Sequence, residues 1–328
     1  MRQTARHRWM MVLLAVLLMS ALLTGCVGQG EQQGQAPPLL PRITVSIDEQ
    51  GVPSVLGISL DLVGSLIGQG VADIRLSPEL VAQMTAANIQ HVELVLLNDG
   101  IYFFVNGQPI PYLTLDEASW QSLDQLATLL AIPAWDTIQG LRTNVLSRFG
   151  VPVAVKFPLQ PGVDEVPLRD SAVLPQVDVA AARAAAGEPE LVIHTAMEVD
   201  SSGRVTIGGL PLENLMTASL GPGTAMVINP DLVATLTAAN VQHFQLETEV
   251  EGLYTYLNGQ ALPRLTWDEA RLKNAVDLFA ALSPQSPVMT WLPLLPSVLP
   301  TSNIEVTVYL PVPEGVQAMP VSPFVGSE

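Results

Sequence analysis

Hydrophobic and polar positions follow the same order in two stretches of the chain. Residues 78–118 read PELVAQMTAANIQHVELVLLNDGIYFFVNGQPIPYLTLDEA, and residues 230–270 read PDLVATLTAANVQHFQLETEVEGLYTYLNGQALPRLTWDEA. The stretches align without a gap at an offset of 230 − 78 = 152, and about half of the positions are identical. Self-similarity over this length predicts a duplicated module.

Each stretch carries start and stop signals for helices and hairpins. A capping residue, a proline and an acid at 77–79 predict a helix start, and Asn88 is expected to end that helix in the left-handed conformation. Asn106-Gly107 predicts a hairpin between apolar runs. Residues 114–117 match a capping box, with Thr114 at the cap, and predict a helix to about 130. The second stretch repeats these signals at 229–231, Asn240, Asn258-Gly259 and 266–269, with its last helix ending near 282.

These elements predict an α+β fold, with a mostly antiparallel sheet and two or three packed helices in each module. An earlier hairpin, turning at Gly51 or Gly203, is expected to begin each module. We predict a signal peptide at 1–25, a flexible tether at 26–42, repeat 1 at 43–162, an acidic and Ala-rich linker at 163–191, repeat 2 at 192–315 and a Pro-rich tail at 316–328. The run AAARAAAG in the linker suggests a short helix.

The composition is that of a folded, strongly acidic protein. Hydrophobic residues make up 48% and charged residues 14% of the chain, whereas disordered segments are poor in the former. Fourteen Lys and Arg stand against 31 Asp and Glu. Because nucleic-acid binding depends on basic contacts to phosphate, this balance excludes a nucleic-acid partner.

The first residues have the pattern of an export signal. Arg2, Arg6 and Arg8 precede an apolar run from Trp9 to Leu23, which is short for a membrane-spanning helix. Leu-Thr-Gly-Cys at 23–26 then resembles the lipobox of bacterial lipoproteins. This resemblance covers only the signal region, and it implies cleavage before Cys26 and attachment of a diacylglycerol to its thiol. The alternative is an ordinary signal peptide that ends near a cysteine.

A lipid on Cys26 would make the membrane the first partner of the mature chain. Cys26 is the only cysteine, so no disulfide forms within the chain. Cleavage removes three arginines and leaves eleven basic against 31 acidic residues, a net charge of −20. Two acyl chains suffice for stable anchoring. We therefore expect the protein in the cell envelope, on the outer face of the cytoplasmic membrane or, in a diderm, on the outer membrane.

The sequence offers little catalytic chemistry. The acids at 116–117 and 268–269 lie at helix starts, where capping explains both of them. His91 and His243 occupy aligned strand positions, and a histidine that bonds a loop there accounts for them better than a metal ligand does. No serine-nucleophile, dinucleotide or phosphate-loop motif occurs. We expect no enzymatic activity, cofactor or metal.

One face of the Asn-Gly hairpins gathers aromatic residues. Because a two-residue turn pairs residues that share a face, Tyr102 and Phe104 are expected opposite Pro111 and Pro109. The second module offers Tyr254, Tyr256 and Pro263 there. We interpret this set as a candidate binding face for a protein, glycan or apolar ligand. The alternative is that a helix covers this face too.

Two modules on a lipid anchor favour a non-enzymatic binding or envelope-scaffold role. One alternative is a carrier of an apolar or lipid ligand, which would need a large enclosed apolar cavity. The other is a hydrolase or metal site, which would need ionisable groups that converge in a cleft.

Overall fold

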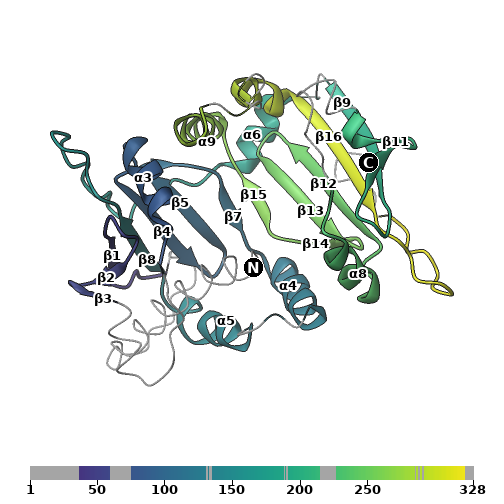
Figure 1. Ribbon diagram of the computed structural model, residues 1–328, viewed down its shortest axis with the longest axis horizontal. Helices are drawn as coiled ribbons and strands as arrows, with labels where there is room; N and C mark the ends of the chain where they lie inside the picture. The colour runs from purple at the N-terminus through teal and green to yellow at the C-terminus, as the bar shows by residue number, and fades with distance from the viewer. Residues whose placement is uncertain are drawn as a thin grey trace. The chain divides into compact units, whose positions relative to one another are not determined.

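The computed structural model describes residues 37–59, 75–130, 132, 135–187, 189, 191–214, 227–284, 286, 289 and 292–321. These residues form helices and a mixed β-structure, which confirms the α+β class (Figure 1). The chain divides into two compact units: unit 1 contains residues 1–110 and 134–175, and unit 2 contains 111–133 and 176–328. The predicted signal peptide, with Cys26, lies outside the described residues. Among those described, no helix has the length and hydropathy needed to span a membrane.

Unit 1 is built on strands in the order β3-β2-β1-β8-β4-β5, with β6 beside β5. β1 and β8 run parallel, and the other pairs are antiparallel. The strands are β1 (Ile43–Ile47), β2 (Pro53–Val55), β3 (Ile58–Ser59), β4 (His91–Leu97), β5 (Gly100–Val105), β6 (Gln108–Pro109) and β8 (Val151–Lys156). The helices are α3 (Pro78–Ala86), α5 (Trp135–Leu141) and the π-helical η1 (Arg142–Leu146).

Unit 2 has the strand order β11-β10-β9-β16-β12-β13-β15-β7, with β14 beside β13. Its strands are β7 (Tyr112–Thr114), β9 (Leu191–Val199), β10 (Val205–Ile207), β11 (Leu210–Pro211), β12 (His243–Glu249), β13 (Gly252–Leu257), β14 (Gln260–Ala261), β15 (Arg264–Thr266) and β16 (Ser302–Tyr309). Its helices are α4 (Glu117–Leu129), α6 (Val179–Ala186), α8 (Pro230–Ala238), α9 (Glu269–Leu282) and α10 (Leu295–Val298), with 3-10 turns η3 (Leu292–Leu294) and η4 (Leu299–Thr301).

An apolar core fills one face of the unit 2 sheet. Val233 of α8 is 1% exposed and packs with Val199 of β9 and Val205 of β10. Leu257 of β13 and Val308 of β16 pack against the same cluster. Because side chains alternate along a strand, the residues between these point to the opposite face of the sheet.

Asparagines fix the turns as the sequence predicts. Asn106 and Asn258 have φ values of 49° and 48°, as a type I′ turn requires at its first central position, and Asn88 and Asn240 end their helices at 53° and 55°. The Asn106 amide also accepts hydrogen bonds from the Gln90 and His91 backbones and donates to the Asn88 carbonyl. The earlier hairpin turns at Gly51 (φ 79°), where a Cβ would meet the Leu76 carbonyl oxygen at 2.0 Å.

The predicted capping boxes are displaced by two residues. Thr114 lies in β7, and Asp116 caps α4 by accepting a hydrogen bond from the Ser119 backbone at 2.7 Å. Asp268 caps α9 in the same way. The prediction of a threonine cap was wrong, because the β7 and β15 strands hold both threonines in pairing and leave the aspartates at the helix starts.

Residues 111–133, which the sequence alignment places in repeat 1, pack in unit 2. β7 pairs antiparallel with β15, with Leu113 opposite Leu265. The hydroxyls of Thr114 and Thr266, aligned residues of the two stretches, lie 2.7 Å apart in a hydrogen bond. The boundary of the compact unit therefore falls inside repeat 1, because this short strand finds its partner in the aligned strand of repeat 2.

Candidate functional site

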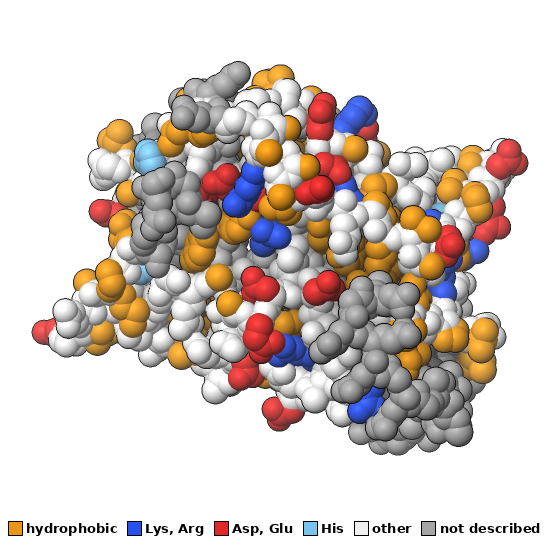
Figure 2. All heavy atoms as spheres, turned by 180° about the vertical axis from the view of Figure 1, so that it is seen from behind, with side chains coloured by type: hydrophobic (Ala, Val, Ile, Leu, Met, Phe, Trp, Pro, Cys, Tyr) orange, Lys and Arg blue, Asp and Glu red, His pale blue; other side chains and the backbone are white. Residues whose placement is uncertain are grey.

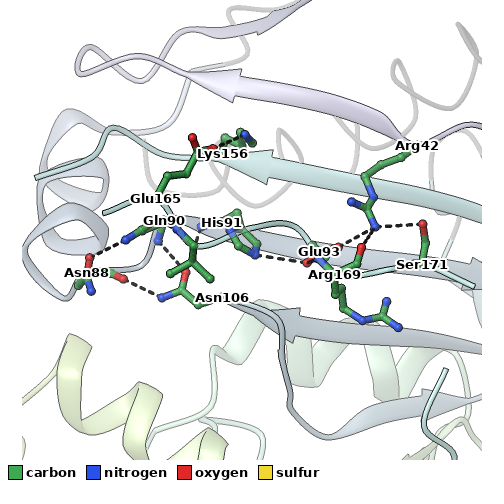
Figure 3. A network of polar contacts seen from close by, with 11 residues as sticks. Arg42, Asn88, Gln90, His91, Glu93, Asn106, Lys156, Glu165, Arg169 and Ser171 are labelled. Carbon is green, nitrogen blue, oxygen red and sulfur yellow. Dashed lines mark hydrogen bonds and ion pairs between the residues drawn. The ribbon is translucent and has the colours of Figure 1, made fainter. Parts of the chain in front are cut away.

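The acidic linker does not run free but lies over the sheet of unit 1 (Figure 3). The Gln90 side chain donates to the Asp164 carbonyl at 3.0 Å and accepts from the Val166 backbone N–H at 2.7 Å. Further along, the Arg169 backbone donates to Glu93 at 3.3 Å. We call residues 163–171 strap 1. The sequence predicted a linker here without this packing, in which buried side chains satisfy the backbone groups of the segment. The short helix suggested in the linker is present as α6.

Beneath strap 1, the Glu93 carboxylate is almost fully buried between the Arg42 guanidinium, the His91 ring and the strap backbone. Arg42 lies 3.2 Å from one carboxylate oxygen and donates to the Ser171 hydroxyl and the Arg169 carbonyl. His91 Nε2 lies 3.3 Å from the other oxygen. Burial lowers the pKa of His91, partly offset by Glu93. Arg42 falls in the predicted tether, so the last residue of that tether packs on unit 1.

Strap 1 also covers the aromatic face predicted in the first module. Tyr102 and Phe104 are 4% and 2% exposed, and the Arg169 guanidinium lies 3.8 Å from the Phe104 ring centroid. Phe104 does pair with Pro109 as the turn predicts, and Pro111 is half-buried in unit 2. The expectation of exposed rings was wrong for Tyr102 and Phe104, and the linker, rather than a helix, packs on the Phe104 ring.

The C-terminal segment repeats this arrangement in unit 2. The Gln242 side chain donates to the Gln317 carbonyl at 3.1 Å and accepts from the Met319 backbone at 2.7 Å. His243 Nε2 lies 3.2 Å from the Pro320 carbonyl, so this histidine bonds a loop as predicted, and burial lowers its pKa. We call residues 315–320 strap 2. The predicted tail therefore begins as a packed segment.

The aromatic residues of the second module are half-buried, as is Pro263. The Tyr254 hydroxyl donates to Glu251 at 2.6 Å and accepts from Arg183 and Arg264 at 2.7 and 2.6 Å. Burial and then Glu251 raise the pKa of Tyr254 to about 12, and burial and the nearby glutamates raise that of Tyr256 to about 12. Both hydroxyls stay protonated, and that of Tyr254 serves as a structural donor to Glu251.

An acidic row crosses the same face of unit 2. Glu247 stands opposite Tyr254 on β13 and opposite Glu305 on β16. Glu305 is 3% exposed and forms an ion pair with His194 of β9, the side chain of which is 65% exposed. Burial and the adjacent Glu247 raise the pKa of Glu305, while His194 lowers it. Sequence reasoning missed this row, because it depends on the register between strands distant in sequence.

The carboxylates at the end of β12 have opposite pKa shifts. Burial, followed by repulsion from Glu247 and Glu251, raises the pKa of Glu249 to about 7. Burial also acts to raise the pKa of Glu251, but hydrogen bonds from Arg183 at 2.8 and 2.6 Å and from Tyr254 outweigh it and lower the value. Glu251 is thus a fixed anion, whereas Glu249 changes its charge near neutral pH.

A cavity of about 220 Å³ lies beside strap 1 in unit 1. The strand register places Ser46, Lys156 and His91 in one row of its wall. However, Lys156 donates to Glu165 at 2.6 Å, and an ammonium held in this way is no base for the serine. His91 stands two strands away from Ser46 and is 1% exposed. The row therefore lacks the adjacent base that a nucleophilic serine needs.

A second cavity, of about 240 Å³, lies in unit 2 between α4 and the loops at the ends of α8 and β13. Leu126 and Leu129 of α4, Leu257 and Met319 give it an apolar part. Both cavities fall below the roughly 300–1,000 Å³ that small-molecule sites usually occupy. Within the described residues, no group of three His, Cys, Asp or Glu side chains has an arrangement that would hold a metal ion.

Comparison with known proteins assigns the chain to no family. No protein-family model matches the chain, no curated protein matches it, and no solved structure matches it.

Proposed function

We propose that this chain is a lipid-anchored extracytoplasmic protein, built from a tandem duplication, which binds a macromolecular partner or acts as an envelope scaffold without catalysis. The anchor at Cys26 rests on the lipobox-like residues 23–26. The membrane and a macromolecule are then the partners, and the expected location is the outer face of the cytoplasmic membrane or the outer membrane.

Aligned residues that make the same contacts support the duplication. Asn258 accepts from the Gln242 and His243 backbones and donates to the Asn240 carbonyl, as Asn106 does in unit 1. Gly203 (φ 81°) lies against a backbone carbonyl, as Gly51 does. Two straps leave their sheets after glycines of positive φ, at Gly162 and Gly315.

The closed strap face is the observation that carries the proposal. In unit 1 its aromatic rings are buried and its carboxylate is paired, so this face presents no site to a small ligand. The cavities of about 220 and 240 Å³ are too small for a lipid chain with its headgroup. Within the described residues, these features support a role of the outer surface, which favours a binding or scaffold protein.

Native mass spectrometry of the membrane-extracted protein tests this function against the carrier alternative. We expect the mass of the processed, diacylated chain with no small apolar ligand in stoichiometric amount. A bound lipid beyond the covalent one would favour a carrier and overturn the proposal. The hydrolase alternative would gain support if Ser46→Ala abolished an esterase or peptidase activity of the purified chain.

Fatty-acid labelling tests the anchor separately. Cys26→Ala is expected to lose the label and the processing at residue 26, and a variant of an exposed residue such as Leu56→Ser serves as the control that keeps both. Full labelling of Cys26→Ala would disprove lipidation at this cysteine.

A further inference from the structure

The first half of β9 is an open sheet edge. β9 pairs with β16 from Leu191 to Glu198, but β10 covers only Met197–Val199 on its other side. Among the described residues, nothing pairs with the outer side of 191–196. Because alternate residues of a strand direct their N–H and C=O groups to opposite sides, half of the backbone groups in this segment point away from the sheet.

Most side chains of this edge are apolar and exposed. Leu191 and Val192 are each 48% exposed and Ile193 is 38% exposed. Proteins usually protect such an edge with proline, lysine or a covering segment, because it is a template for another strand. Between Leu191 and Ala196 the only polar side chains are His194 and Thr195. This edge therefore lacks the usual protection.

Unit 1 shows that protection at the aligned edge. Pro41 aligns with Ile193, and a proline has no N–H to donate to an added strand. Arg42 aligns with His194, and its guanidinium turns into the sheet toward Glu93. Of the two aligned edges, the one in unit 1 is protected against an added strand, whereas the one in unit 2 lacks such protection among the described residues.

The two faces of the open edge specify what would bind it. Leu191 and Ile193 have the parity of Met197 and Val199, which belong to the apolar core side. His194 has the opposite parity and reaches the acidic row at Glu305. The whole chain carries −17, and acidic side chains are spread over the face of the molecule in Figure 2. An added strand would thus meet apolar contacts on one side; on the other it would meet His194, whose charge Glu305 balances, and the exposed Glu198, in a chain of strongly negative net charge.

We propose that Leu191–Ala196 binds an extended segment of a cationic partner by strand addition, with alternating apolar and basic residues in that segment. Backbone hydrogen bonds would provide affinity, and the alternation would provide selectivity. A second copy of this chain fits less well, because both copies are strongly acidic. This inference rests on the binding role proposed above and names the class of partner.

Titration with synthetic peptides tests the proposal on the mature chain. The probe is a fluorescent seven-residue peptide that alternates lysine and valine, and the controls replace lysine by glutamate or methylate every second amide nitrogen. We expect the cationic peptide to bind, and both controls to bind at least about tenfold more weakly. Equal binding of the three peptides, or no binding of the cationic one, overturns the proposal even if native mass spectrometry still supports a binding protein.

Two edge variants locate the site. Ile193→Pro, which copies unit 1, is expected to weaken cationic-peptide binding at least about tenfold. Ile193→Lys keeps the backbone bonds but repels the peptide, and so covers the case that the proline variant fails to fold. Leu210→Ser is the control on another exposed apolar residue and is expected to bind normally. Unchanged binding by Ile193→Lys, or a dimer that Ile193→Lys dissociates, refutes the cationic partner.

Discussion

The strap-covered faces of unit 1 and unit 2 have the same strand pairing and opposite chemistry. In unit 1, Val95 of β4 stands opposite Pro152 of β8. At the aligned positions of unit 2, Glu247 stands opposite Glu305. The residues that make the turns, such as Asn106 and its partners, are the same in both. The difference shows that the shared turn residues suffice to keep the same strand pairing. The face beneath the straps tolerates apolar residues in one unit and acidic residues in the other.

Placing two carboxylates side by side in a buried row costs stability, because each loses hydration and repels the other. Glu305 is compensated by His194, which lies at the open edge of β9. Unit 1, with apolar residues there, needs no such compensation.

The largest expected effect concerns the buried ring of unit 1. Phe104→Ala removes a side chain that is 2% exposed and packed under Arg169, so we expect a loss of about 3–5 kcal/mol in the free energy of unfolding. Tyr256→Ala, at the aligned position, removes a half-buried ring and should cost less. Chemical denaturation of both variants measures the difference. Equal losses in the free energy of unfolding would mean that the strap-covered faces of the two units are buried to the same degree.

An intermediate effect is expected at the fixed anion of unit 2. Arg183→Met leaves the fully buried Glu251 without its cation, and we expect a loss of about 2–4 kcal/mol. Arg204→Met breaks the exposed pair with Glu213 and should cost much less, because water screens that pair. Thermal and denaturant unfolding of the two variants measure both losses. Similar losses would show that the buried Arg183–Glu251 pair contributes no more to stability than the exposed pair does.

A smaller, pH-dependent effect is expected at Glu249. Its pKa is about 7 in the folded protein against an ordinary value of 4.5, so the folded chain holds this proton more tightly than the unfolded chain. The cost is absent below about pH 4.5, grows as the pH rises and is complete above about pH 7. Glu249→Gln should therefore stabilise unit 2 by about 1–2 kcal/mol at pH 8, allowing for partial exposure, and hardly at pH 4. A stabilisation that does not depend on pH would show that charge is not its cause.

Local signals predicted much of the fold. The Asn-Gly turns, the left-handed Asn88 and Asn240 and the pairing of Phe104 with Pro109 follow from conformational preference and strand periodicity, which act over a few residues. The straps could not be predicted in this way. Their contacts, such as Gln90 with Val166, join the residue before a strand to an irregular segment 76 residues away.

The candidate site was predictable only in part, for the same reason. The alternation of side chains along a strand places Tyr102 and Phe104 on one face, but it does not predict which segment packs on that face. The row from Tyr254 to His194 needs the register of four strands from distant parts of the chain. The contrast between Pro41 and Ile193, however, is visible in the aligned sequences once the strand order is known.

Residue-resolved hydrogen exchange with and without the alternating lysine–valine peptide tests the contrast between the two edges most directly. In the free protein, we expect outward amides of Leu191–Ala196 to exchange rapidly, because no backbone acceptor covers them within the described chain. The peptide should slow exchange in this segment and leave residues 39–44 of unit 1 unchanged. Protection of both edges, or of neither, would contradict the account.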